Sequence, residues 1–293
     1  SGSGFQFEGK VGISATISEK VSAQIDLNTV STDSAENWLG SRQVYGVWKI
    51  EDSMELKTGK FISNYGWTAA YAPGLYRINA GIITEFYGVD QVGADLKYTA
   101  GDLTAAVTVA NGFFGEGNSA TTQDPQNNED YAVGLDVVYS LHDMGSVNLE
   151  LINDAGAETT TADQTPGSGY HIGLNATLTP SKEVTIAAEM IKQGVNTKAG
   201  GEDLEHFGMM ALVNYKLASA MPMSVTFQAS QTDVDGDSDP SETTTEFALA
   251  LLTNPAGTDK LGANLEINYA TVETESQDTE YEYGFSAELL YVF

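Results

Sequence analysis

Apolar and polar side chains alternate along the stretch Tyr170-His-Ile-Gly-Leu-Asn-Ala-Thr-Leu178. Its even-numbered positions are apolar or aromatic, and its odd-numbered positions are polar or small. Since successive side chains of a β-strand point to opposite faces of the sheet, this pattern predicts a strand with one apolar face and one polar face.

The same alternation continues on both sides of this stretch, and helical periodicity is nearly absent. Together the alternating segments amount to about fifteen strands of about ten residues each. The clearest of the others are residues 5–17, 21–27, 103–109, 131–139, 147–151, 184–190, 207–215, 223–229, 247–251, 261–269 and 281–293. Weaker alternation marks 43–50, 53–61 and 88–98.

Two features distinguish a membrane barrel from a soluble β-sandwich or propeller, which shows the same alternation. Short turns and long polar loops follow one another along the chain, as they do at the two rims of a transmembrane barrel. Tyrosines such as Tyr98, Tyr139 and Tyr215 stand at the ends of the apolar face, as in an interfacial aromatic girdle. We therefore predict an all-β fold, a transmembrane antiparallel up-and-down β-barrel whose backbone groups pair within the sheet.

The expected strand number is about 16, with 14 as the alternative, because bacterial single-chain barrels usually have an even number. A strand beyond those counted would lie within 70–86 or come from a division of the N-terminal segment. One barrel then accounts for residues 5–293. Residues 1–4, Ser-Gly-Ser-Gly without Met, are interpreted as a disordered N-terminal segment or linker that follows a removed signal peptide.

Composition excludes several classes of function. The chain has 293 residues, with 41 Asp and Glu against 13 Lys and Arg, which gives a formal charge of −28. Such a charge repels nucleic acid, so no nucleic-acid partner is expected. The absence of Cys excludes a disulfide framework, a thiolate metal site and a Cys nucleophile. No apolar run approaches the roughly 18 residues of a membrane-spanning helix.

Residues 57–113 carry a more specific series of motifs. They are Lys57-Thr-Gly-Lys-Phe61, Gly66-Trp-Thr-Ala69, Tyr76-Arg-Ile-Asn79, Gly93-Ala-Asp-Leu-Lys-Tyr98 and Val107-Thr-Val-Ala-Asn-Gly-Phe113. In this order they resemble the OmpL-like β-barrel porins, the second β-barrel porin family. The chain departs from the family pattern at Thr68, which replaces an acidic residue, at Ile78 after Arg77, and at Phe113, which replaces Trp. The resemblance implies an outer-membrane porin whose third outer loop folds into the lumen, and residues 62–85 are the candidate for this constriction loop.

The C-terminal segment also resembles a known pattern. It alternates from Ala287 onward and ends on Phe293. This resembles the closing strand of bacterial outer-membrane proteins, and the resemblance implies that Phe293 is a signal read by the barrel assembly machinery.

Charged residues with lumen parity suggest a pore constriction. Lys49, Lys57, Asp95 and Lys97 occupy the polar parity of their strands, and Arg77 lies in the candidate inward loop. Basic side chains and a polar loop at a narrow point can select solutes by size and charge. The alternative is that these groups are scattered charges in a water-filled pore.

The remaining lumen parity is acidic, and the clearest positions are Asp136, Glu150, Glu189, Glu266 and Glu282, with Glu246 and Glu288 as further members. Because acidic walls raise the local concentration of cations, we expect a mild cation preference.

Two stretches, 209–213 and 248–252, are apolar on both parities. They indicate either a packed patch under a loop or a contact with a neighbouring subunit.

One string of acidic residues has the spacing of a metal site. Asp233, Asp235, Asp237 and Asp239 alternate around Gly236 in an expected outer loop. Alternating carboxylates can direct several oxygens toward one Ca²⁺ ion, although the glycine is misplaced for an EF-hand and no helices flank it. The alternative is a solvated acidic loop, and apart from this possible calcium ion we expect no cofactor.

We interpret the chain as a non-enzymatic porin of the bacterial outer membrane that allows passive diffusion of small hydrophilic solutes and ions. A Ser-His-acid group cannot be assembled from the spacing of His142, His171 and His206. The alternative is a structural or adhesion barrel that anchors an external layer through its acidic loops. The expected partners are outer-membrane lipid, the barrel assembly machinery, the solutes and two further copies of the chain in a trimer.

Overall fold

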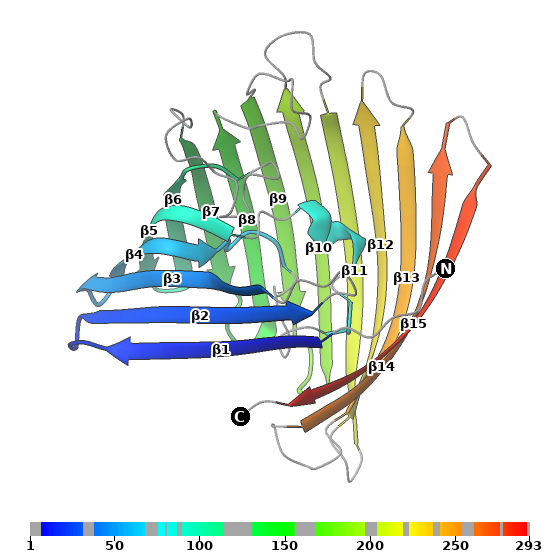
Figure 1. The fold of residues 1–293 in the computed structure, drawn as a ribbon, viewed down its shortest axis with the longest axis horizontal. Coiled ribbons are helices and arrows are strands. Elements are labelled where there is room, and N and C mark those ends of the chain that lie inside the picture. The colour runs from blue at the N-terminus through cyan, green and yellow to red at the C-terminus, as the bar shows by residue number, and fades with distance from the viewer. Residues whose placement is uncertain are drawn as a thin grey trace.

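A computed structural model describes residues 7–31, 38–67, 76–79, 81–86, 90–113, 131–155, 168–196, 204–218, 223–236, 241–253, 261–275 and 278–291. These residues form one antiparallel sheet of 15 strands that follow one another in chain order, and the sheet curls round on itself (Figure 1). The residues interpreted as an N-terminal linker, 1–4, and the terminal Phe293 lie outside the described residues.

The strands have the following bounds: β1 Phe7–Thr16, β2 Val21–Ser31, β3 Trp38–Glu51, β4 Met54–Ile62, β5 Asp90–Ala100, β6 Leu103–Ala110, β7 Ala132–Ser140, β8 Gly145–Asp154, β9 Ser168–Leu178, β10 Val184–Asn196, β11 Leu204–Leu217, β12 Met223–Gly236, β13 Glu242–Thr253, β14 Leu261–Thr274 and β15 Glu280–Tyr291. Two short 3-10 helices, η1 (Ile82–Phe86) and η3 (His142–Met144), interrupt the series.

The alternation predicted an antiparallel up-and-down β-barrel, and this is confirmed. Every segment counted from the sequence is a strand, including the three with weak alternation. The expected total of 16 differs from the 15 strands of the described residues. In the segment 70–86, where a further strand was thought to lie, the described residues instead include the 3-10 helix η1, and the N-terminal segment is not divided.

The burial of side chains is the reverse of that in a soluble protein. Along β9, Ile172 and Leu174 are 48% and 50% exposed, whereas His171 and Asn175 are 1% and 7% exposed. The same reversal holds along β12, where Phe227 is exposed and Gln228 is buried. Water does not favour such an apolar exterior, but the hydrocarbon of a bilayer does. The alternating strands are therefore arranged with their apolar parity toward lipid and their polar parity inward.

The tyrosines placed at the strand ends lie on the outer surface. Tyr98, Tyr139, Tyr215 and Tyr281 are each about half exposed or more. Tyr269 packs against Tyr283, with ring centroids 5.1 Å apart. Amphipathic rings of this kind suit the boundary between lipid and water. Within the described residues, no helix combines the length and the apolar character needed to cross a membrane.

Candidate functional site

The chain after β4 turns onto the inner face of the sheet. Gly66, at φ +95°, donates its backbone N–H to Oε2 of Glu150 at 2.9 Å. Trp67 donates its backbone N–H to Oε1 of Glu189 at 2.8 Å and its indole N–H to Oγ1 of Thr177 at 2.6 Å. Two carboxylates of the inner wall therefore accept the N–H groups of an irregular segment that has no strand partner.

The ring of Tyr65 occupies a space that only glycine leaves open. Tyr65 lies edge-on to Phe113, with 5.3 Å between ring centroids, and both side chains are buried together with Ile152. A Cβ atom added to Gly134 on β7 would lie 1.9 Å from the Tyr65 hydroxyl oxygen. The missing side chain of Gly134 therefore allows the loop to contact the wall.

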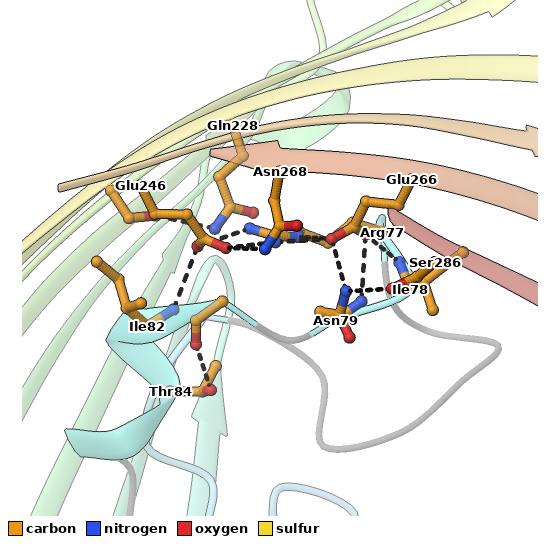
Figure 2. A network of polar contacts seen from close by, with 12 residues as sticks. Arg77, Ile78, Asn79, Ile82, Thr84, Gln228, Glu246, Glu266, Asn268 and Ser286 are labelled. Atoms are coloured by element: carbon orange, nitrogen blue, oxygen red, sulfur yellow. Dashed lines mark hydrogen bonds and ion pairs between the residues drawn. The ribbon is translucent and has the colours of Figure 1, made fainter. Parts of the chain in front are cut away.

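Further along the loop, Arg77 binds two glutamates on neighbouring strands (Figure 2). Its Nη1 and Nη2 donate to the two oxygens of Glu246 on β13, at 3.0 and 2.7 Å. Its Nε and Nη2 donate to Oε1 of Glu266 on β14, at 3.2 and 2.8 Å. The guanidinium thus makes a bidentate contact with one carboxylate and a forked contact with the other.

Glu266 also holds the backbone that follows Arg77. Its Oε2 accepts the N–H groups of Ile78 and Asn79, at 2.7 and 3.2 Å (Figure 2). The Asn79 amide donates to Oε1 of Glu266 at 2.9 Å and to the hydroxyl of Ser286 on β15 at 3.2 Å. One buried carboxylate therefore fixes three consecutive residues of the loop.

Arg77 keeps its charge at this buried position. Arg77 is 3% exposed, and Glu246 and Glu266 are 5% and 1% exposed. Burial opposes the charge of the guanidinium, but the hydrogen bonds with Glu246 and Glu266 outweigh that effect, so the pKa of Arg77 is raised above its usual value. Together Arg77, Glu246 and Glu266 carry a formal charge of −1. Removal of Arg77 would leave two buried carboxylates with no cation beside them.

Apolar contacts attach the helical part of the same loop. Ile83 of η1 is fully buried against Ala187 and Ile191 of β10 and against Met210 and Leu212 of β11, and Trp67 and Tyr76 pack beside this cluster. Figure 1 shows η1 on the concave side of the sheet, in front of β10–β12. This explains why residues 209–213 are apolar on both parities, since the inward members form a packed patch under the loop. The first of the two interpretations of that stretch is therefore confirmed.

A second group of charged residues lies on β3, β4 and β5. Lys97 forms an ion pair with Glu55, with Nζ and Oε1 3.0 Å apart. The Nζ atom of Lys57 lies 4.5 Å from the centroid of the Phe61 ring and 3.4 Å from the side-chain oxygen of Asn64. Lys49 is exposed and stands opposite Glu55 in the strand register.

Asp95 stands opposite Lys57 in the register and is 3% exposed. Its Oδ2 accepts hydrogen bonds from the Thr108 hydroxyl at 2.8 Å and from the Asn64 amide at 3.3 Å. Asp95 is therefore held by polar neighbours on β6 and on the start of the loop, rather than facing the lumen as an open carboxylate.

The structure divides the residues expected at a constriction into two groups. The three lysines share one wall, whereas Arg77 contacts β13 and β14. Of the expected acidic wall, Glu150, Glu189 and Glu266 are buried anchors of the loop, Asp136 is buried on β7, and Glu282 is exposed on β15. Sequence reasoning placed these carboxylates inside the barrel but missed their role as acceptors for the loop.

The anchoring residues on the loop itself, Tyr65, Trp67, Asn79 and Ile83, were also missed. The signal available for them was the combination of aromatic residues with glycines inside a segment that lacks alternation. Gly66 and Gly81 both adopt positive φ, and a Cβ atom added to Gly81 would lie 2.7 Å from the Gln228 amide nitrogen.

The acidic string is only partly described. Asp233 and Asp235 belong to β12 and point to its outer face. The connection between β12 and β13 is therefore shorter than the outer loop that was expected. The physical reason is that β12 stays paired with β11 and β13 beyond its apolar residues 223–229, up to the segment that holds these two aspartates. Asp237 and Asp239 lie outside the described residues. Within the described ranges no group of three or more acidic or histidine side chains is placed to hold a metal ion, and the calcium site stays a prediction.

Comparisons with known proteins agree with this geometry. The family described as "Putative beta-barrel porin-2, OmpL-like" matches residues 3–227. No curated protein matches the chain. The trimer form of OmpT from Vibrio cholerae has a TM-score of 0.65 at 13% identity, with 97% of this chain and 91% of that chain covered.

Two other solved structures are similar to the same extent. The outer membrane channel DcaP of Acinetobacter baumannii has a TM-score of 0.68 at 12% identity, over 97% of this chain and 84% of that chain. The anion-selective porin from Comamonas acidovorans has a TM-score of 0.67 at 10% identity, over 97% and 89%.

The apolar exterior, the polar interior and the folded-in loop define a β-barrel protein of the bacterial outer membrane, in the class of the porins. Within that class, the chain belongs to the OmpL-like β-barrel porin family, whose model covers most of its length. This confirms the resemblance drawn from residues 57–113.

Proposed function

We propose that this protein is a passive channel for small hydrophilic solutes and ions across the outer membrane. The observation that carries the proposal is the attachment of the loop to one inner wall through Arg77, Glu246 and Glu266. A loop held in this way would narrow the lumen, and on β3–β5 the charged side chains of Lys49, Lys57, Lys97 and Glu55 remain at least partly exposed. Narrowing by a fixed loop supports selection by size, and the exposed charges support selection by charge.

No chemical step is part of this function. Solutes would pass down their own concentration gradient, and the protein would supply only a polar passage through the hydrocarbon layer. Porins and channels among the similar structures are consistent with a non-enzymatic role.

Single-channel recording tests the proposal. The full chain, refolded in detergent and inserted into a planar bilayer, should give discrete conductance steps in KCl. Proteoliposomes should swell with small sugars and stop swelling above a size limit set by the loop. Bilayers exposed to the same detergent without protein are the control. A folded barrel that inserts but gives no steps would contradict the proposal and favour the structural or adhesion barrel.

We also propose a homotrimer that is inserted by the barrel assembly machinery. The trimer form of OmpT, which shares the fold, supports this arrangement. Cross-linking of the protein in native outer membranes, followed by denaturing electrophoresis, should show a species of three chains.

A variant without Phe293 should accumulate outside the membrane fraction if that residue is the assembly signal.

The mild cation preference expected from the sequence depends on acidic side chains that meet the passage. Glu150, Glu189, Glu246 and Glu266 are instead at most 5% exposed and are bound to the loop. The sign of the charge selection therefore has to be argued from the inward-facing groups that stay exposed.

A further inference from the structure

The inward-facing charges of β1–β5 differ from those under the loop. Among the side chains of these strands that the structure describes, the inward-facing basic residues are Lys10, Lys49, Lys57 and Lys97, and the acidic ones are Asp26, Glu55 and Asp95. Among these described side chains there are four lysines and three carboxylates, although acidic residues outnumber basic ones about threefold in the whole chain.

Burial keeps two of these carboxylates out of direct contact with the lumen. Asp26 and Asp95 are each 3% exposed, and polar neighbours satisfy them: Lys10 and two glutamines contact Asp26, and Thr108 and Asn64 contact Asp95. Glu55 is the carboxylate that stays open, with a side chain 29% exposed, and it faces Lys97, which is 44% exposed.

Lys49, Lys57 and Lys97, named here the lysine face, therefore place three positive charges beside two carboxylates, the partly exposed Glu55 and the buried Asp95 opposite Lys57. The strand pairing brings these lysines together. Glu55 on β4 stands between Lys49 on β3 and Lys97 on β5. Two residues further along β4, Lys57 stands opposite Asp95 on β5. Phe61 and Tyr45 border Lys57, with ring centroids 4.5 and 5.9 Å from its Nζ atom.

We propose that the lysine face makes this channel selective for small anions, which would pass along β3–β5 opposite the anchored loop. The proposal rests on the porin function proposed above and reverses the sign expected from the composition. A cluster of like charges on a wall of low dielectric constant raises the local concentration of counter-ions. The carboxylates bound to the loop contribute less to this field, because Arg77 and the N–H groups of the loop compensate them.

The rival sources of charge are the inner parity of β15 and the end of β13. Glu280 and Glu282 on β15 and Glu242 on β13 are exposed, and Glu288 is partly exposed, so these four carboxylates are the alternative lining of the passage. In the strand order of the sheet, β13 and β15 lie eight or more strands away from β3–β5. Any experiment must therefore compare the two sets of residues.

The test is the reversal potential of the reconstituted full-length channel under a KCl gradient. The unmodified protein should show a chloride permeability several-fold above that of potassium. A triple variant with Lys49→Gln, Lys57→Gln and Lys97→Gln should lose this preference or become cation-selective, whereas the conductance should stay of similar size. Lys192→Gln is the matched control, because Lys192 bears its charge on the outer face and is paired there with Glu205.

Each outcome has one meaning. A cation-selective wild-type channel that becomes neutral in a Glu242→Gln, Glu280→Gln, Glu282→Gln, Glu288→Gln variant would overturn the proposal and assign selection to β13 and β15. An unchanged reversal potential in the lysine variants would also overturn it. Should the triple variant fail to fold, as shown by lost heat-modifiable electrophoretic mobility, the Lys97→Gln single variant must shift the potential toward the potassium side. A barrel without any conductance would contradict the porin function itself.

Discussion

The wall formed by β8–β14 and the wall formed by β3–β5 have the same alternating sequence pattern but different uses for their charged residues. On β8–β14, carboxylates such as Glu150, Glu189, Glu246 and Glu266 are buried and bind the loop. On β3–β5, Lys49, Lys57 and Lys97 remain at least partly exposed. The difference shows that inward parity alone does not make a charged residue part of the passage. A charge on the covered wall binds the loop, whereas a charge on the open wall is, in the channel proposed above, available to the solute.

This comparison predicts that changes on the covered wall alter stability and pore size, and that changes on the open wall alter only selectivity. The largest effect is expected for Arg77→Ala. It leaves Glu246 and Glu266 buried without their cation, and loss of one partner from a buried ion pair costs about 3–5 kcal/mol. The loop should detach, so the single-channel conductance should rise and become noisy.

Arg77→Lys is the graded control for that variant, because it keeps the charge but loses the bidentate contact with Glu246. It should give an intermediate conductance. If Arg77→Ala leaves the conductance and the swelling limit for sugars unchanged, the ion pairs do not hold the constriction.

A somewhat smaller effect is expected for Ile83→Ala. The side chain is fully buried in the apolar patch under the loop, and truncation of a buried Ile to Ala costs about 2–5 kcal/mol. Proteolysis of the loop in the folded barrel should become faster than in the wild type. Ile13→Ala, on the exposed outer face of β1, is the matched control and should leave the proteolysis rate unchanged.

Gly134→Val should have the next largest effect. A Cβ atom at this position would overlap the Tyr65 hydroxyl, and forced overpacking costs about 1–3 kcal/mol. The midpoint of thermal unfolding should therefore fall, and a second change, Tyr65→Ala, should recover part of the loss. Gly46→Val provides the comparison, since an added Cβ there has only the Ser22 carbonyl oxygen nearby, at 3.9 Å. Equal losses at both glycines would show that Tyr65 is not held by the gap at Gly134.

The smallest effect on stability is expected on the open wall. Lys97→Gln breaks the ion pair with Glu55, which is partly exposed, and such pairs contribute about 0–1 kcal/mol. Thermal unfolding should hardly change, whereas the reversal potential should move. A large loss of stability in Lys97→Gln would remove the distinction between the two walls.

Much of the fold was predictable from local pattern. The period-two alternation of the stretch 170–178 is confirmed in β9, with Ile172 and Leu174 outside and His171 and Asn175 inside. This is possible because side-chain direction along a strand is set by the backbone alone. Strand ends were predicted less well: β12 and β10 run further than their apolar segments, since backbone pairing does not need apolar side chains.

The loop contacts were not predictable from the same pattern. Arg77 and Glu246 are 169 residues apart, and Gly66 and Glu150 are 84 residues apart. Which carboxylate accepts which donor depends on the register of many strands and on the path of a segment without periodicity. No local property of Glu246 distinguishes it from Glu282, yet the first is a buried anchor and the second is exposed.

By itself, the amino-acid sequence determined the class of fold, the membrane environment and the side of the sheet on which each charge lies, because these follow from alternation and from the hydration of apolar and polar groups. The tertiary structure alone decided which inward charges are neutralised and which remain open. The reason is that the field inside the barrel depends on the partners and the burial of each charge, and on β13 and β14 these are set by one loop that brings Arg77 between Glu246 and Glu266.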